Sequence, residues 1–233
     1  MSGTVCLQGG GEFSVGYRPM DASLVRADPG PVVVTALAGA VGREYATANR
    51  HGVAHYRAVG APDVVGAPDV REDPVGALVA LRRARVLVLP GGSPSRLLHA
   101  LTSTEVGEVL GQLLADGGTV IGSSAGAMVL GSFTVLPDMT ALPERPGPAV
   151  APGLALVPGV LVVPHWTGGR SDWLEAVQAA VPAGTLVLGL PEDCGVVVRA
   201  GRATAAGLAP TWLVDAGRDL PVGDTVPLPP AAA

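Results

Sequence analysis

Ser124 has the local surroundings of a catalytic nucleophile. Gly122 lies two positions before it and Gly126 two positions after it, which gives the pattern G-x-S-x-G. In hydrolases with this pattern, the serine lies in a sharp turn between a strand and a helix, where glycines let neighbouring backbones come close. The apolar residues 119–121 directly before the motif predict that strand. The motif indicates a serine hydrolase, although in a chain with 33 glycines it also fits a glycine-rich turn before a helix.

A serine hydroxyl attacks a carbonyl group effectively only when a base accepts its proton. Among the four histidines, His165 is the best placed, because it directly follows the apolar run 161–164. Open α/β sheets place their ligand sites at the carboxyl ends of strands, so we expect His165 near Ser124. Of the other three histidines, His51 is expected in a loop, His55 on a strand face and His99 in a helix.

An acidic group usually fixes the tautomer of such a base. Asp138 follows the helix that Ser124 is expected to open, and a short loop there could bring its carboxylate to His165, although it also fits a turn after a proline. Glu192 and Asp193 follow another predicted strand and remain rivals for this role. They could equally bind substrate or end the strand.

Backbone N–H groups must also stabilise the oxyanion of the transition state, at about 3 kcal/mol for one donor. Gly91 and Gly92 lie between the predicted strand 86–89 and a helix that Ser93 can cap, so their N–H groups are expected to face the same edge of the sheet as Ser124. The N–H of Ala125 would be the second donor. The same glycines also fit a plain helix-capping turn.

The elements that must position these residues follow from the apolar pattern. Five continuous apolar runs predict strands buried on both faces, which is typical of a parallel sheet: residues 5–7, 32–35, 86–89, 119–121 and 160–163. Helices are expected between them, beginning near Asp73, Ser93 and Thr102. Short strands are expected in the carboxyl-terminal part at residues 186–188, 196–198 and 212–214. We therefore expect a three-layer α/β fold, with a mostly parallel sheet flanked by helices and a short β-rich carboxyl-terminal edge.

The chain of 233 residues fits a single α/β domain over residues 1–226, with a disordered tail at 227–233. Residues 60–70 contain a short tandem duplication, expected in a surface loop, and residues 143–158 are expected in an irregular loop.

Composition excludes several classes of function. The net charge is −5, with both signs scattered along the chain, so neither a nucleic acid nor a membrane surface is an expected partner. Cys6 and Cys194 lie far apart in the sequence and are expected to be buried free thiols, with no metal site and no cofactor. With no leader sequence and no apolar run of about 18 residues, we expect a cytoplasmic protein that acts on small peptides as a monomer or homodimer.

The motifs in this order resemble one family, the serine peptidases of the peptidase E (aspartyl dipeptidase) and cyanophycinase type. The resemblance rests on residues 7–13, 90–98, 122–127, 137–139 and 164–167. It implies the class I glutamine-amidotransferase-like fold, which is flavodoxin-like, with serine in the place of the amidotransferase cysteine.

Carried onto this sequence, the resemblance implies a catalytic triad of Ser124, His165 and Asp138. It also implies that the N–H groups of Gly92 and Ala125 form the oxyanion hole. Gly91 and Glu192 are further candidates for substrate binding. Because family members cleave bonds next to aspartyl residues, a cation must bind the substrate carboxylate, and the candidate here is Arg170.

The expected activity is hydrolysis of peptide or isopeptide bonds in small acidic, aspartate-containing peptides through an acyl-enzyme. One alternative is an esterase with the α/β-hydrolase fold, which shares the motif and the chain order Ser, Asp, His. Against it, about four predicted strands precede Ser124, and no His-Gly oxyanion motif is present. The other alternative is an amidotransferase-like binding or regulatory protein without turnover.

Overall fold

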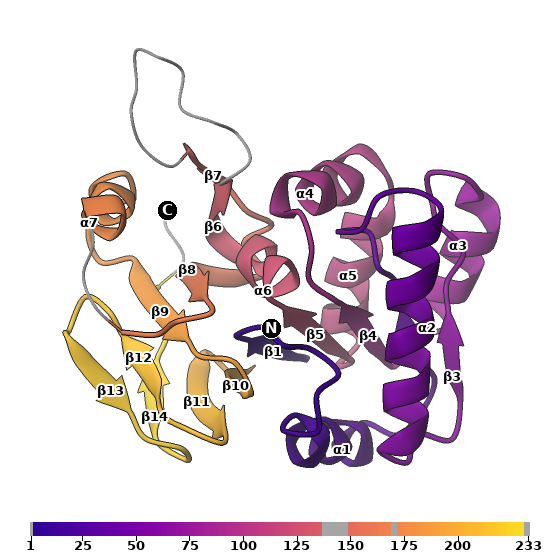
Figure 1. Ribbon diagram of the computed structural model, residues 1–233, viewed down its shortest axis with the longest axis horizontal. Helices are drawn as coiled ribbons and strands as arrows, with labels where there is room; N and C mark the ends of the chain where they lie inside the picture. Colours follow the sequence, from indigo (N-terminus) through magenta and orange to yellow (C-terminus); the bar gives the residue numbers. More distant parts are fainter. Residues whose placement is uncertain (1, 137–148, 169–171, 231–233) are drawn as a thin grey trace.

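The computed structural model describes residues 2–136, 149–168 and 172–230, which form two β-sheets with helices packed against them (Figure 1). The larger sheet has eight strands in the order β14-β11-β10-β1-β5-β4-β2-β3. Its parallel part consists of β1 (Thr4–Gln8), β2 (Val32–Val34), β3 (Val64–Gly66), β4 (Val86–Leu89) and β5 (Thr119–Ser123). Antiparallel strands extend it beyond β1, namely β10 (Cys194–Arg199), β11 (Arg202–Gly207) and β14 (Thr225–Pro227).

Helices cover both faces of the larger sheet. One face carries α1 (Arg18–Ala27) and α2 (Arg43–Ala58). The other carries α3 (Pro74–Arg82), α4 (Pro94–Ser103) and α5 (Val106–Ala115). Successive strand residues alternate between the two cores, since Val88 packs with the first pair of helices, and Leu87 and Leu89 pack with the other three. Each central strand is therefore apolar on both faces, and the expected α/β sheet flanked by helices is confirmed.

A second sheet packs beside the first and has the strand order β13-β12-β9-β8-β6-β7 (Figure 1). Its strands are β6 (Gly131–Leu136), β7 (Ala149–Pro152), β8 (Val157–Pro164), β9 (Leu186–Leu190), β12 (Thr211–Leu213) and β13 (Arg218–Leu220). The short helix α6 (Ala125–Leu130) contacts β5 as well as β6 and β8, so it joins the two sheets. Helix α7 (Asp172–Ala179) packs on the second sheet through Leu174 and Val177.

The prediction that the run 160–163 belongs to the main parallel sheet was wrong. This run lies in β8, which pairs in parallel with β6 and β9 of the second sheet. Val160 and Val162 point into the core that α6 shares with the larger sheet, whereas Leu161 and Val163 pack with α7. Because both faces of β8 are buried, its apolar pattern is the same as that of a strand in the larger sheet.

Further differences concern short elements and helix boundaries. The segment 60–70 contains β3, and the expected loop at 143–158 contains β7 and the start of β8, while its residues 143–148 lie outside the described part of the chain. Pro227, expected to open a disordered tail, ends β14, and the Leu228 N–H donates to the Gly201 carbonyl at 2.8 Å.

The helix expected to begin near Thr102 begins later. Thr102 lies inside α4, where its hydroxyl donates to the Leu98 carbonyl at 2.9 Å. Instead, the Thr104 hydroxyl accepts the N–H of Val106, the first residue of α5, at 3.3 Å. A threonine hydroxyl can bond either a preceding carbonyl or a following N–H, so the sequence pattern alone did not locate this boundary.

Within the described residues, no helix combines the length and the apolar character needed to span a membrane. The cytoplasmic location expected from the sequence stays a prediction.

Candidate functional site

Ser124 lies in a strained turn between β5 and α6, with backbone angles φ 50° and ψ −113°. The flanking glycines are required by close backbone contacts. A Cβ atom at Gly122 would lie 2.5 Å from the Gly126 carbonyl oxygen, and one at Gly126 would lie 2.1 Å from the Leu89 carbonyl oxygen. The Ser124 N–H donates to the Gln8 carbonyl of β1 at 3.0 Å, which holds the turn at the carboxyl edge of the parallel strands. The G-x-S-x-G motif therefore forms the strand-to-helix turn that its sequence predicts.

His165 reaches Ser124 from the end of β8. The distance from its Nε2 to Ser124 Oγ is 3.0 Å. Its backbone also has a positive φ of 52°, and its N–H donates to the Gly9 carbonyl at 2.7 Å. A Cβ atom at Gly10 would lie 2.2 Å from the imidazole ring, so a side chain at that position would displace the histidine. The glycine-rich loop after β1 thus supports the imidazole next to the serine.

Glu192 bonds the other nitrogen of the same histidine. Its Oε1 lies 2.8 Å from His165 Nδ1. Since a carboxylate only accepts hydrogen bonds, Nδ1 carries the proton in this contact and the Nε2 lone pair is left to face the Ser124 hydroxyl. Both side chains are partly open to solvent, with 51% of His165 and 61% of Glu192 exposed. Asp138, the residue expected in this position with Glu192 as its rival, lies outside the described residues, so that expectation stays a prediction.

The glycine turn after β4 faces the serine. A Cβ atom at Gly91 would lie 3.1 Å from Ser124 Cβ, so Gly91 borders the nucleophile directly. Gly92 has φ +138° and packs against the Ala38 carbonyl. Ala125 is the first residue of α6, where helical N–H groups lack an intrahelical acceptor. The two residues expected to form the oxyanion hole, Gly92 and Ala125, therefore lie on two different turns, one after β4 and one after β5, and their role as donors stays a prediction.

Sequence reasoning missed Glu12, although its glycine-rich loop is part of the family resemblance. The Gly91 N–H donates to Glu12 Oε1 at 3.0 Å, and the Ser123 hydroxyl lies 3.4 Å from Glu12 Oε2. The feature that could have identified Glu12 is its position just after β1, because β1 is the neighbour of β5 in the sheet. The same loop is tied to the Glu192 turn, because the Ser14 hydroxyl donates to the Asp193 carboxylate.

The remaining histidines do not contact Ser124. His55 lies inside α2, not on a strand face as expected, and its Nε2 is 2.7 Å from Asp21 Oδ2 in the buried core. His51 is exposed on α2, also not in the expected loop, whereas His99 lies in the helix α4, as expected. Among the residues that the structure describes, no group of three or more His, Cys, Asp or Glu side chains could hold a metal ion.

The two cysteines are both buried and free, as expected. Burial raises the pKa of the Cys6 thiol well above its usual range. Neither cysteine takes the place of the nucleophile, because Ser124 occupies the turn.

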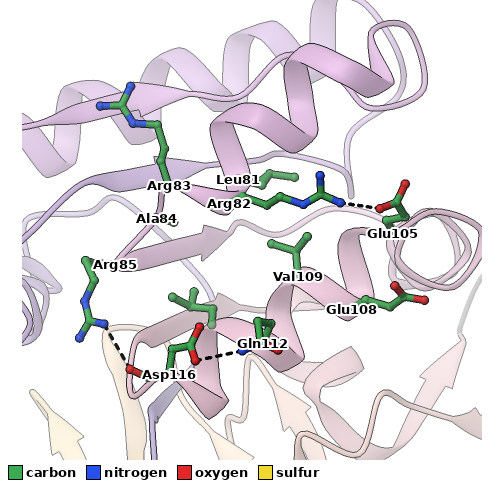
Figure 2. Close-up of a pocket in the computed structure, with 11 residues that line it drawn as sticks. Leu81, Arg82, Arg83, Ala84, Arg85, Glu105, Glu108, Val109, Gln112 and Asp116 are labelled. Atoms are coloured by element: carbon green, nitrogen blue, oxygen red, sulfur yellow. Dashed lines mark hydrogen bonds and ion pairs between the residues drawn. The ribbon is translucent and has the colours of Figure 1, made fainter.

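Two hollows in the surface lie at different positions relative to this site. One of about 460 Å³ is bordered by Glu12 and lies between the loop after β1 and α2. The other, of about 570 Å³, lies beside α5 near the start of β4 and β5, at the opposite edge of the sheet from Ser124 (Figure 2). There Arg82 pairs with Glu105 at 2.5 Å, and Arg85 donates to the Asp116 carbonyl at 3.3 Å. Of these two hollows, only the first is lined by a residue that contacts the site, Glu12, and its other lining residues include Arg18 and His51.

Comparison with known proteins places the sequence in a family. Residues 56–206, more than half of the chain, match the family described as Peptidase family S51. No curated protein matches the sequence significantly.

Solved structures with a similar fold include a peptidase from an acI-B1 Actinobacterium, with a TM-score of 0.78 and 20% sequence identity over 97% of both chains. They also include a candidate peptidase E protein from Listeria monocytogenes EGD-e, with a TM-score of 0.62 and 16% identity, covering 89% of this chain and 99% of the other. At these identities, the likeness to both structures is one of fold.

Proposed function

We propose that this chain, which belongs to peptidase family S51 and is a serine-type peptidase, uses a triad of Ser124, His165 and Glu192, with Glu192 in the place expected for Asp138. The observation that carries this proposal is one continuous set of hydrogen bonds. It runs from Ser124 Oγ to His165 Nε2 at 3.0 Å and from His165 Nδ1 to Glu192 Oε1 at 2.8 Å. This is the arrangement of nucleophile, base and orienting acid that acyl transfer needs.

In the proposed mechanism, His165 accepts the hydroxyl proton as Ser124 Oγ attacks the carbonyl carbon of the scissile bond. The N–H groups of Ala125 and Gly92 stabilise the oxyanion that forms. His165 then gives the proton to the leaving amine, which departs from an acyl-enzyme. A water molecule, deprotonated by His165, hydrolyses the acyl-enzyme and releases Ser124. Glu192 stabilises the imidazolium in both steps.

The proposed substrates are small acidic peptides with peptide or isopeptide bonds next to aspartyl residues. This rests on the resemblance to peptidase E and cyanophycinase. Arg170, which we propose as the group that binds the substrate carboxylate, lies outside the described residues. We also propose that the protein acts in the cytoplasm, as a monomer or homodimer, and without a cofactor.

The test is to compare the wild-type protein with the Ser124→Ala variant. We expect the wild type to release the amine from Asp-X dipeptides and to be labelled by a fluorophosphonate at Ser124, as mapped by mass spectrometry. The Ser124→Ala variant should do neither. Equal cleavage by the two proteins would refute the proposal.

The same experiment separates the alternatives. Turnover of esters far faster than of any peptide would favour an esterase. Absence of labelling in a folded sample that binds acidic peptides saturably would favour a binding protein on the same scaffold.

A further inference from the structure

Glu12 brings a carboxylate to the nucleophile. Its Oε1 accepts the Gly91 N–H at 3.0 Å, and Gly91 itself borders Ser124. Glu12 is only half-buried, and its second oxygen lies 3.4 Å from the Ser123 hydroxyl. Neither Ser124 nor His165 is among its hydrogen-bond partners in the described part of the chain. Glu12 is therefore placed beside the reacting atoms without belonging to the proposed proton-transfer chain.

This position is electrostatically unfavourable for the reaction unless a cation is supplied. Negative charge develops on the carbonyl oxygen of the substrate as Ser124 attacks, close to the glycine turn that Glu12 bonds. A second negative charge nearby opposes that development. Within the residues that the structure describes, no arginine or histidine lies at ion-pair distance from Glu12. A positively charged group on the substrate would supply such a charge.

We propose that Glu12 determines specificity by binding a positively charged group, such as a free α-ammonium, on the acyl side of the scissile bond. The leaving amine must lie at His165 to receive its proton, whereas Glu12 bonds the turn that faces the carbonyl group. An α-ammonium is one carbon atom away from that carbonyl, so it approaches the same turn. The hollow of about 460 Å³ on the other side of Glu12 is lined by Arg18 and His51, so we place the ammonium on the Gly91 side of the carboxylate and not in this hollow. This inference rests on the proposed function of Ser124.

The test uses the Glu12→Gln variant, in which the amide oxygen can still accept the Gly91 N–H but the negative charge is lost. Two probes are compared, diphenyl 1-amino-2-carboxyethylphosphonate and its N-acetylated form. With either probe, Ser124 Oγ attacks phosphorus, phenoxide leaves, and the hydroxyl proton passes to His165. The preference is the ratio of labelling rates for the free and the acetylated amine. Comparing this ratio between the two proteins cancels the intrinsic reactivity of the probes.

We expect the preference for the free amine to fall roughly 10- to 100-fold in the Glu12→Gln variant, as for the loss of one charged hydrogen bond. Glu72→Gln, which removes an exposed carboxylate elsewhere, should leave the preference unchanged. Thermal unfolding of both variants checks that they are folded.

The outcomes separate the two proposals. An unchanged preference in Glu12→Gln, or an equal loss of reactivity toward both probes, would mean that Glu12 only supports the turn. Either result would overturn the inference and leave the function of Ser124 intact. Failure of both probes to label Ser124 in the wild type would overturn the proposed function, and this inference with it.

Discussion

Replacing Glu192 with glutamine should slow acylation while leaving the fold intact. The carboxylate bonds His165 Nδ1 at 2.8 Å and, in the proposed mechanism, faces an imidazolium once Ser124 has lost its proton. The amide keeps the size of the side chain and can still accept the Nδ1 proton, but it carries no charge. The variant therefore removes the electrostatic contribution of Glu192 to the transition state.

The magnitude follows from the geometry and the exposure of this pair. Two unit charges about 4 Å apart interact by about 1 kcal/mol in water and about 4 kcal/mol in surroundings typical of a protein surface. Because 51% of His165 and 61% of Glu192 are exposed, solvent screens the pair, and we take about 2 kcal/mol. This corresponds to a loss of roughly 30-fold in rate. It is far below the ~10⁴-fold loss for the buried aspartate of a serine peptidase triad.

The assay is the second-order rate of Ser124 labelling by a fluorophosphonate, which needs no knowledge of the substrate. Asp138→Asn is measured in parallel, and Glu72→Gln is the control for loss of a surface charge. We expect a clear loss only for Glu192→Gln. A rate within about twofold of wild type for Glu192→Gln, together with a large loss for Asp138→Asn, would refute the assignment and restore Asp138 as the orienting acid.

Two other predictions address the glycine turn and the buried tyrosines. Gly91→Ala places a Cβ 3.0 Å from Glu12 Oε1 and 3.1 Å from Ser124 Cβ, so labelling should fall at least tenfold. Gly111→Ala, in an open position within α5, should instead raise the free energy of unfolding by about 0.5–1 kcal/mol without changing labelling; equal effects on labelling would contradict the first prediction. Burial raises the pKa of all three tyrosines, Tyr17, Tyr45 and Tyr56. Ionisation therefore favours the unfolded chain above about pH 10, where each tyrosine reduces stability by up to about 1.4 kcal/mol per pH unit until its folded-state pKa is reached. Tyrosinate absorbance at 295 nm should then appear only together with loss of the circular dichroism signal, and a gradual rise with an unchanged signal would contradict this.

Local signals in the sequence located several elements correctly because short-range sterics and hydrogen bonds fix them. Asp73 and Ser93 cap the helices that they were expected to begin, accepting N–H groups at 2.9 and 3.2 Å, respectively. The glycines around Ser124 allow close backbone contacts that any side chain would prevent. The predicted helix start near Thr102 was wrong because a threonine hydroxyl can bond either a preceding carbonyl or a following N–H group.

The contacts of the candidate site were harder to predict from the sequence because they join segments that are far apart along the chain. Glu192 was one of several acidic residues after predicted strands, and its contact with His165 depends on β8 and β9 being parallel neighbours. Glu12 follows β1, and it meets Gly91 only because β5 alone separates β1 from β4 in the sheet. Neither contact can be predicted from the spacing of residues along the chain.

By itself, the sequence determined the turn that presents Ser124, the α/β class of the fold and the family, because glycine spacing and continuous apolar runs are local constraints. The tertiary structure decided which sheet contains β8, that Glu192 bonds His165, and that Glu12 lies beside the glycine turn. The physical reason is that a strand buried on both faces has the same apolar pattern in either sheet. Only the order of the strands brings residues from distant parts of the chain to one edge.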